Sequence, residues 1–276
     1  MKKKLLLVWM KGQEKKQLAA TIRQLTQWFS VDTKERDQIK EKISGYAFVA
    51  SYGGDGTFLK AARFIASPIP LFGINSDPKH KEGFYAPVTL QTLQQACLAL
   101  QTNRYKVLPL LRLQAIIDGK PLPYLALNEC FVGNKESYLS AHYEIQYKRL
   151  RAKQKDSGII IATPSGSWGW YASAGGTPIP LQSKYAVFLC REPYCGKTIA
   201  CKIVQGILQR KERLTIVSHM PKGIVSLDSA MVFPLPKGKK ATIRLAKTPL
   251  LMIQFPFFQK TYGLQKKEMR KKYEKK

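Results

Sequence analysis

A buried strand that ends in a glycine turn with one carboxylate most constrains the fold of this chain. Residues 46–59 read YAFVASYGGDGTFL, an apolar run of strand type that breaks at Gly53-Gly54-Asp55-Gly56 and resumes at helical spacing from Thr57. Glycine lets the backbone approach a ligand closely, and a helix that starts here points its N–H groups and its dipole toward the same ligand. The segment therefore predicts a strand, turn and helix whose amides suit a phosphate group.

Asp55 is the one acidic group in this turn. A carboxylate does not bind phosphate, because like charges repel, but it fits a general base or a metal contact beside a transferred group. The alternative is an ordinary turn between a strand and a helix that needs glycine only for its dihedral angles. Short motifs have a real rate of false positives, so other segments have to decide between the two.

Strand-like and helix-like segments alternate over the first hundred residues. After the apolar run at 5–9, a helix is expected from about Gln13, because Leu18, Ile22, Leu25 and Trp28 recur at its period. The pattern continues with a strand that ends at Ser51, a helix at 57–66, a strand at 69–74 and a helix that carries Leu90, Leu93, Cys97 and Leu100. Continuous apolar strands that alternate with helices predict a parallel sheet covered on both faces.

Ligands of such sheets bind beyond the carboxyl ends of the strands. The glycine turn at 53–57 lies at one such end, and Gly73-Ile74-Asn75 lies at another. Beyond residue 103 the helical period is replaced by short β-type runs that are separated by turn residues, such as YLALNECFV, HYEIQYKRL, GIIIAT, YAVFLC and ATIRLA. The sequence thus predicts an α/β N-terminal domain with a Rossmann-like parallel sheet and a β-rich C-terminal domain, with a boundary near residue 103.

Length and composition agree with two globular domains, since the chain has 276 residues of which 45% are hydrophobic. No apolar stretch reaches the roughly 20 residues that span a bilayer. The opening MKKKLLLVWMKG is too short in apolar residues for an export signal and is interpreted as a first strand. Five cysteines without paired spacing fit buried thiols in a reducing cytoplasm.

The charge is strongly basic, with 46 Lys and Arg against 18 Asp and Glu. Such a field attracts polyanions without specifying which one. The cationic residues are scattered apart from one dense run at 263–276, which is interpreted as a solvated tail. A basic surface is favoured over a dedicated polyanion site, so no nucleic acid or membrane partner is predicted.

Three segments of the second half carry more polar detail than a β-core requires. Asn128-Glu129 interrupts an apolar run, which needs partners, water or an edge position. The stretch 157–176 runs from an apolar strand into Thr163-Pro164-Ser165-Gly166-Ser167 and two tryptophans, a composition that suits a nucleoside because hydroxyls bond its edges and an indole stacks on its base. Packing explains the tryptophans equally well. Asp228 falls at a turn between strands, where aspartate is more often structural.

These segments together resemble the NAD kinase family. The motifs occur in the family's order over roughly residues 46–255, and several ordered motifs are more specific than one. Residues 73–84, GINSDPKHKEGF, look like the mitochondrial-type branch, which has a longer loop with Asp-Pro. The motifs are Gly53-Gly54-Asp55-Gly56-Thr57, Gly73-Ile74-Asn75, Asn128-Glu129, Thr163-Pro164-Ser165-Gly166-Ser167 with Ser173-Ala174-Gly175-Gly176, and Val225-Ser226-Leu227-Asp228.

The resemblance implies a cytoplasmic homo-oligomeric enzyme that phosphorylates the adenosine-ribose 2′-hydroxyl of NAD to give NADP. ATP, another nucleoside triphosphate or polyphosphate would be the donor, Mg²⁺ would accompany the donor, and no residue is assigned as a metal ligand. The resemblance also implies that the last strands return to the first domain. The expected domains are therefore 1–103 completed by about 248–276, and an NAD-binding domain at 104–247.

Roles follow from the resemblance position by position. Asp55 matches the catalytic aspartate that accepts the hydroxyl proton. The residues expected at the donor phosphates are Gly53, Gly54, Gly56 and Thr57, and those expected at NAD are Asn75, Asn128, Glu129, Asp156, Thr163, Ser165, Gly166, Ser167, Trp168, Trp170 and Ser173.

The sequence departs from the family pattern at three places. Trp168-Gly169-Trp170 stands where most members have Thr-Ala-Tyr, which keeps an aromatic residue at the third place and replaces a hydroxyl with an indole at the first, so the adenine contacts do not follow from the resemblance. The aspartate that usually precedes Gly158 is Ser157 here, and Asp156 one position earlier would point to the other side of the strand. Ser229 and Ala230 replace the usual glycine and glutamine after Asp228.

Two other classes share part of the pattern. Lipid kinases of the diacylglycerol and sphingosine type share the Gly-Gly-Asp-Gly-Thr turn, and phosphofructokinases have a similar one, but they lack the Asn128-Glu129 and Thr163–Ser167 motifs. A non-catalytic polyanion-binding protein on a kinase scaffold would account for the altered nucleotide loop and the net charge of +28.

Overall fold

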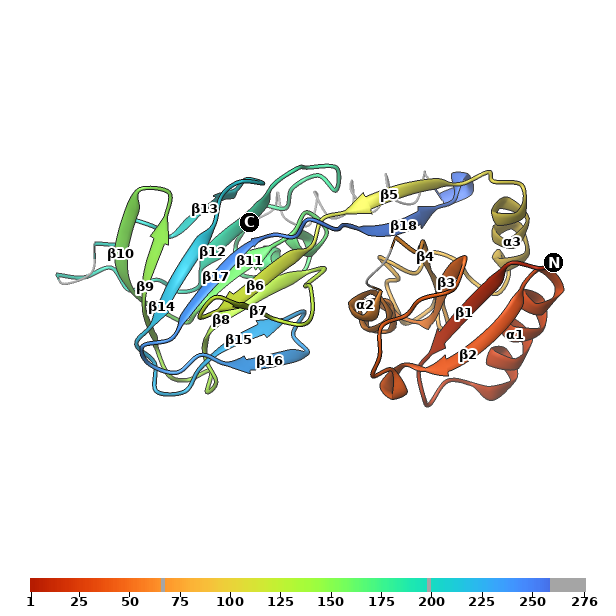
Figure 1. Ribbon diagram of the computed structural model, residues 1–276, viewed down its shortest axis with the longest axis horizontal. Helices are drawn as coiled ribbons and strands as arrows, with labels where there is room; N and C mark the ends of the chain where they lie inside the picture. The colour runs from red at the N-terminus through yellow and green to blue at the C-terminus, as the bar shows by residue number, and fades with distance from the viewer. Residues whose placement is uncertain (66–67, 198–199, 259–276) are drawn as a thin grey trace. The chain divides into compact units, whose positions relative to one another are not determined.

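The chain forms two compact units (Figure 1). The computed structural model describes residues 1–65, 68–197 and 200–258, so the basic run at 263–276 lies outside the described residues. Unit 1 consists of Met1–Pro109 together with the chain from Leu250 onward, and unit 2 consists of Leu110–Pro249. The sequence placed the divisions near residues 103 and 248.

Unit 1 is built on a six-stranded sheet with the order β2-β1-β3-β4-β18-β5. The registers of β1 with β2 and β3, of β3 with β4, and of β4 with β18 are all parallel. The elements are β1 (Lys4–Trp9), α1 (Lys15–Trp28), β2 (Ser30–Glu35), β3 (Phe48–Gly53), α2 (Asp55–Phe64), β4 (Leu71–Asn75), α3 (Leu93–Gln101), β5 (Lys106–Leu110) and β18 (Leu250–Gln254).

The helices of unit 1 cover the sheet with their apolar residues. Leu25 of α1 and Cys97 of α3 are fully buried in one core cluster with Phe72 of β4 and Phe255. Leu18, Ile22 and Trp28 pack at the margin of the same cluster. The predicted helical period over 18–28 therefore gives the buried face of α1.

Strand β2 was not predicted, because its sequence SVDTKE is charged and mostly exposed. Its backbone pairs with β1 from Lys4↔Ser30 to Trp9↔Glu35, at the edge of the sheet. An edge strand needs only one partner and few buried side chains, so hydrophobic periodicity does not detect it. Strand β5 lies in the sheet of unit 1, although its sequence begins the β-rich half of the chain.

Unit 2 contains two six-stranded sheets, of order β10-β9-β14-β17-β6-β7 and β13-β12-β11-β8-β15-β16. The registers within both sheets are antiparallel. The strands are β6 (Leu113–Ile117), β7 (Lys120–Pro121), β8 (Glu129–Asn134), β9 (Ala141–Tyr147), β10 (Leu150–Asp156), β11 (Ile159–Ala162), β12 (Ala186–Cys190), β13 (Gln205–Leu208), β14 (Leu214–Ser218), β15 (Gly223–Leu227), β16 (Met231–Pro234) and β17 (Lys240–Leu245), and one short helix, α4, covers Trp170–Ser173.

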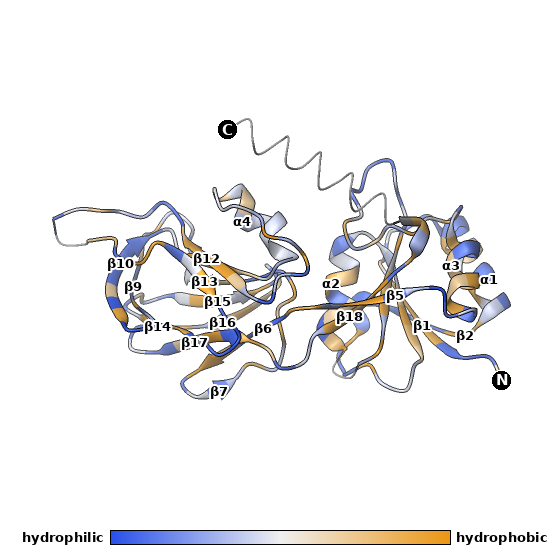
Figure 2. Ribbon diagram, turned by 90° about the horizontal axis from the view of Figure 1, so that it is seen from above, coloured by the Kyte–Doolittle hydropathy of each residue, from blue (hydrophilic) through white to orange (hydrophobic). Residues whose placement is uncertain are grey.

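The inner faces of the two sheets form one core, in which Tyr143 and Ile243 of one sheet join Ile161 and Phe188 of the other. The outer face of the second sheet carries a further apolar cluster with Ile160 of β11 and Tyr171 of α4. Figure 2 shows the difference between strands, because β12 is coloured as hydrophobic and β10 mainly as hydrophilic. A parallel α/β unit and an antiparallel β-rich unit confirm the predicted fold class.

The cysteine prediction is wrong for one pair. Cys97, Cys130 and Cys190 are buried free thiols, as expected, but Cys195 and Cys201 form a disulfide. The Cα atoms of these two residues are 5.4 Å apart, within the usual range for a disulfide. Their spacing in the sequence matches no pairing pattern and did not reveal this. No helix in the described ranges is long and apolar enough to cross a membrane.

The shared core of unit 2 makes a stability prediction. Phe188 is fully buried between the sheets, so Phe188→Ala should lower the free energy of unfolding of unit 2 by about 3–5 kcal/mol. Ile207 on the neighbouring strand β13 is 45% exposed, and Ile207→Ala should cost less than about 1 kcal/mol. Urea titration followed by tryptophan fluorescence measures both, and equal losses would contradict the core assignment.

Candidate active site

The glycine turn of unit 1 joins a buried strand to a helix, as the sequence predicts. All residues of β3 are buried up to Gly53, and Gly54 is the N-cap of α2. The helix begins at Asp55 rather than at Thr57, so the carboxylate lies within the first helical turn. A negative charge in that position is stabilised by the helix dipole.

The glycines of this turn have different reasons to be glycine. A Cβ on Gly53 would lie 2.3 Å from Oγ1 of Thr57, which leaves no room for a side chain. Thr57 is only 1% exposed and packs beneath the turn, so its hydroxyl is shielded by Gly53. A Cβ on Gly54 would lie 3.2 Å from Cδ of Lys81, whereas at Gly56 the nearest atom would be 3.9 Å away. The turn is therefore open to a close approach mainly at Gly56.

Asp55 is tied to a segment almost thirty residues further along the chain. Its two carboxylate oxygens accept hydrogen bonds from the backbone N–H groups of Phe84 (3.1 Å) and Tyr85 (2.7 Å). The Tyr85 ring stacks on Phe58 of α2 with centroids 4.7 Å apart, which holds the segment against the helix. Burial raises the pKa of Asp55, and the two amide hydrogen bonds partly oppose this. A raised pKa makes the carboxylate a stronger base.

Asn75 organises the loop that reaches Asp55. It is the last residue of β4 and is 6% exposed. Its amide donates to the carbonyl of Lys81 (3.1 Å), and its Oδ1 accepts from the N–H of Asp77 (3.0 Å). Gly83 passes so close that a Cβ would lie 2.6 Å from Nδ2 of Asn75, and its φ of +66° also favours glycine. Asn75 therefore shapes the loop at 76–86.

In unit 2, a tight turn places Asp228 behind the predicted Asn128-Glu129 pair. Asp228 and Ser229 have φ of 49° and 50°, and the Ala230 N–H donates to the carbonyl of Leu227, as in a type I′ turn between β15 and β16. The Asp228 carboxylate accepts from the backbone N–H groups of Leu127 (3.0 Å), Asn128 (2.7 Å) and Glu129 (3.3 Å). Asp228 thus fixes the backbone where β8 begins, which agrees with the structural role expected for it.

Glu129 is buried beside this carboxylate. Its side chain accepts a hydrogen bond from the Ser229 hydroxyl (3.0 Å). Burial first, and the charge of Asp228 second, raise the pKa of Glu129 to about 7. The protonation of Glu129 therefore changes near neutral pH. Its hydrogen-bond partner, Ser229, occupies the position where the family pattern has glycine.

The loop at 163–167 packs directly on the same backbone. Thr163 donates through Oγ1 to the carbonyl of Leu127 (2.6 Å) and through N–H to the carbonyl of Asn128 (2.9 Å). Ser165 also donates to the Leu127 carbonyl (3.2 Å). A Cβ on Gly166 would lie 1.9 Å from the carbonyl oxygen of Asn128, so only glycine fits here. Two motifs that are distant in the sequence thus form one cluster.

The aromatic part of the nucleotide loop makes packing contacts. Ser167 bonds the carbonyl of Pro164 (2.7 Å) and accepts from the N–H of Ile179 (3.0 Å). Trp168 donates through Nε1 to the carbonyl of Ile179 (3.0 Å), and the Trp170 ring lies 5.0 Å from that of Phe131. The Arg191 guanidinium lies 5.5 Å from the centre of the Trp170 ring. Ser173 is exposed on α4, and its hydroxyl donates to the Gly169 carbonyl (3.4 Å).

Asp156 is not part of this cluster. It is 4% exposed and accepts from the Tyr143 hydroxyl (2.5 Å) and from the N–H of Gly158 (2.7 Å), beside the core residue Cys190. Burial raises the pKa of Asp156 to about 6. The shift by one position relative to the family pattern therefore places this carboxyl against the core, as the alternation of strand faces leads one to expect.

Sequence analysis missed the groups that hold these clusters together. They are the backbone amides of Phe84 and Tyr85, the Lys81 side chain, which also donates to Ser76 Oγ (2.9 Å), and the Ser229 hydroxyl. Backbone donors leave no side-chain signature. Gly83 directly before Phe84 was the one signal for a close approach.

Comparison with known proteins gives a consistent result. The family description ATP-NAD kinase N-terminal domain matches residues 7–105. An NAD kinase of Acidithiobacillus ferrooxidans is 31% identical over 219 residues, which cover 75% of this chain and 70% of that protein. A probable NADH kinase of Oryza sativa subsp. japonica is 26% identical, with 74% and 69% covered. An NAD kinase of Bacteroides fragilis is 37% identical, and this chain spans about half of its length (56% and 53% covered).

Solved structures share the fold. Yeast NADH kinase complexed with NADH superposes with a TM-score of 0.77 at 15% identity, over 92% of this chain and 84% of that one. At this identity the likeness concerns the fold alone.

The raised pKa of Glu129 predicts how stability depends on pH. The folded-state pKa of about 7 lies above the ordinary 4.5. The stability that the protonated Glu129 contributes is therefore fully present below pH 4.5 and is lost as pH rises through 7. Glu129→Gln should flatten this fall, which amounts to about 3 kcal/mol. Urea titrations across this pH range measure it, with Glu144→Gln on the outward face of β9 as the control. An unchanged slope would contradict the burial of a titrating Glu129.

The three hydrogen bonds to Asp228 predict that removing its charge loosens the backbone at 127–129. Asp228→Asn keeps the left-handed turn, which asparagine also adopts, but it removes the charged acceptor for three amides. Unit 2 should lose about 1–3 kcal/mol of stability. Amide hydrogen exchange at 127–129 should accelerate, whereas Ser229→Ala should leave it nearly unchanged. Equal protection in Asp228→Asn and the parent would show that this carboxylate does not hold the segment.

Proposed function

Because this chain belongs to the NAD kinase family, we propose that it transfers a phosphoryl group to the adenosine-ribose 2′-hydroxyl of NAD, giving NADP. The donor is ATP, another nucleoside triphosphate or polyphosphate. The observation that carries this proposal is the position of Asp55: one partly buried carboxylate with a raised pKa, in the first turn of a helix that follows a glycine turn.

Asp55 acts as the general base in this proposal. As the 2′-oxygen attacks the terminal phosphorus of the donor, the hydroxyl proton passes to the carboxylate. The bond between that phosphorus and the bridging oxygen breaks, and the nucleoside diphosphate or the shortened polyphosphate leaves. The two amide hydrogen bonds from Phe84 and Tyr85 fix the carboxylate while leaving its other lone pairs able to accept. The Gly56 side of the turn is open to the donor phosphates.

Phosphoryl transfer has a loose transition state, so alignment and charge neutralisation supply most of the rate. In this proposal, Mg²⁺ bound to the donor would supply neutralisation of the charge on the donor oxygens. The described residues contain no cluster of three or more His, Cys, Asp or Glu side chains that could hold a metal ion by themselves. A single carboxylate beside a phosphate turn suits an ion held mainly by the phosphates.

Unit 2 binds NAD through the cluster at the start of β8. Asn128 and Glu129 are held by Asp228 from one side and by Thr163, Ser165 and the close approach of Gly166 from the other. Such double support gives the precise backbone geometry that recognition of a ribose or a base needs. Ser167, Trp168, Trp170 and Ser173 complete the nucleotide loop in this proposal, with the two indoles contributing by packing.

The finer assignments rest on the resemblance. We expect a cytoplasmic homo-oligomer of the mitochondrial-type branch, and a similarity to a rice probable NADH kinase agrees with that branch. The lipid-kinase alternative is not favoured, because the Asn128-Glu129 and Thr163–Ser167 motifs pack together as one cluster.

Asp55→Asn tests the proposal. It removes the proton acceptor while keeping the size of the side chain, so NADP formation should fall by about 10²-fold or more. Asp37 is an exposed aspartate of the same unit that pairs with Lys60 on the surface, and Asp37→Asn should retain activity within about twofold. A coupled assay with NAD, ATP and Mg²⁺ measures both. The proposal fails if the parent forms no NADP with any donor, or if Asp55→Asn is as active as Asp37→Asn.

A further inference from the structure

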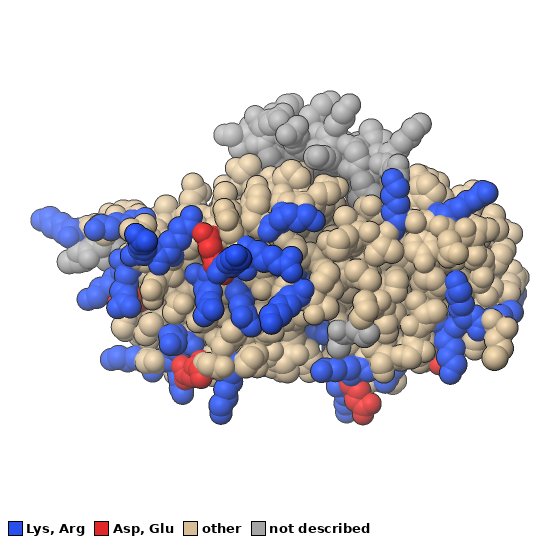
Figure 3. Space-filling model, turned by 45° about the horizontal axis from the view of Figure 1, so that its top comes forward, with Lys and Arg blue, Asp and Glu red and all other residues tan. Residues whose placement is uncertain are grey.

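The outer face of the first sheet of unit 2 carries an unusual concentration of positive charge. Inward residues of β9, β14 and β17 enter the core, and the alternate residues point outward. Figure 3 shows Lys and Arg gathered over part of the surface with few acidic side chains among them. The outward cations are Arg151, Lys153 and Lys155 along β10, Arg213 directly before β14, and Lys240 and Arg244 on β17.

Strand register places these cations around short polar side chains. One row across four strands runs Arg151, Gln146, Thr215, Thr242, and the next runs Lys153, Glu144, Val217, Lys240. Neighbouring strands lie about 4.8 Å apart, so the long side chains surround the short central ones. The result is a hollow of about 300 Å³, lined by both threonines, Gln146, Glu144, Val217, Arg151, Arg213 and Lys240.

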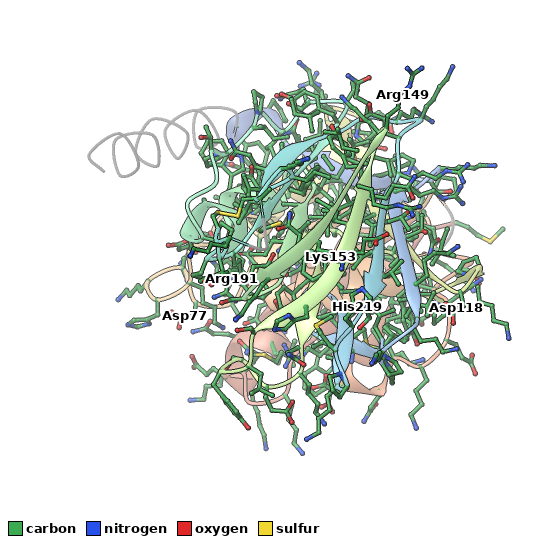
Figure 4. The ribbon with its side chains drawn as sticks, turned by 90° about the vertical axis from the view of Figure 1, so that its left-hand side faces the viewer. Asp77, Asp118, Arg149, Lys153, Arg191 and His219 are labelled. Carbon is green, nitrogen blue, oxygen red and sulfur yellow. A yellow bond between two sulfur atoms is a disulfide. The ribbon has the colours of Figure 1, made fainter. Side chains whose placement is uncertain are left out.

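The charges in this hollow are poorly balanced. Glu144, the one acidic residue among its lining residues, lies 3.2 Å from Arg151, which leaves Arg213 and Lys240 uncompensated within the lining. Like charges that share one sheet face repel each other. Arg151 is 65% exposed, and Figure 4 shows Lys153 on β10 with Arg149 at the turn between β9 and β10. A face of this kind is stabilised by an anion that several cations can share.

We propose that this hollow binds a short inorganic polyphosphate chain, at a site distinct from the Asp55 turn. Arg and Lys neutralise phosphate oxygens, and the Thr215 and Thr242 hydroxyls, 3.5 Å apart, donate to the same oxygens. The residues that line the hollow offer Val217 as their apolar group and no aromatic ring on which a base could stack, which favours phosphate over a nucleoside or single-stranded nucleic acid. A second copy of the same face would repel the first.

The test is calorimetric titration of the full chain with sodium tripolyphosphate at low salt. The face variant Arg151→Gln/Arg213→Gln/Lys240→Gln removes three charges from the hollow. The control variant Lys15→Gln/Lys16→Gln/Arg23→Gln removes three exposed charges from α1. Binding at the donor site is common to all three proteins, so a difference between them reports the sheet face.

We expect the parent and the control variant to bind with equal affinity and stoichiometry. The face variant should lose about tenfold or more in affinity for one equivalent of tripolyphosphate, while its NAD kinase activity and its circular dichroism stay unchanged. Equal loss in both variants, or in neither, overturns the proposal. It is also overturned if a short RNA duplex displaces tripolyphosphate and is held more tightly by the same face, or if the face variant dissociates an oligomer of the parent.

Discussion

Both candidate clusters depend on carboxylates that are held by consecutive backbone N–H groups. Asp55 accepts from Phe84 and Tyr85, and Asp228 accepts from the amides of 127–129. Burying a carboxylate without such partners costs several kcal/mol or forces its protonation. Each carboxylate therefore requires a particular loop conformation, and each loop in turn carries the groups proposed to meet the substrates.

The two carboxylates differ in what remains available for chemistry. Asp228 is 7% exposed and spends its oxygens on three amides, so it acts as a positioning residue for Asn128 and Glu129. Asp55 is less buried, accepts hydrogen bonds from two backbone N–H groups and lies at the open side of a glycine turn. The same physical device thus yields a structural anchor in unit 2 and, in unit 1, the carboxylate that is proposed to act as the base.

Local patterns in the sequence were sufficient for most of the strands and helices of unit 1. The period of Leu18, Ile22 and Leu25 predicted α1, because one face of this helix is buried. The apolar run before Gly53 predicted β3, because every residue of this strand is buried. Strand β2 was not predicted, because this edge strand is held by backbone pairing and its side chains show no hydrophobic pattern. The Cys195–Cys201 disulfide was not predicted, because the spacing of these two cysteines in the sequence does not show that their Cα atoms lie 5.4 Å apart.

The sequence indicated the candidate side chains of the site but not the backbone groups that hold them in place. Glycine motifs and the Thr163–Ser167 segment stand out in the sequence, whereas the amides at 84–85 have no residue type that identifies them as donors. Asp156 shows a different case: it was listed among the residues expected at NAD, and in the structure its carboxylate accepts a hydrogen bond from Tyr143 in the core.

A crystal structure of the chain with NAD and a non-hydrolysable ATP analogue tests the central claim most directly. The account predicts that the adenosine-ribose 2′-oxygen lies within about 3.2 Å of an Asp55 carboxylate oxygen, with the terminal phosphate of the donor in line behind it. A well-ordered NAD whose 2′-oxygen bonds a different group, with Asp55 facing only the Phe84 and Tyr85 amides, would contradict it.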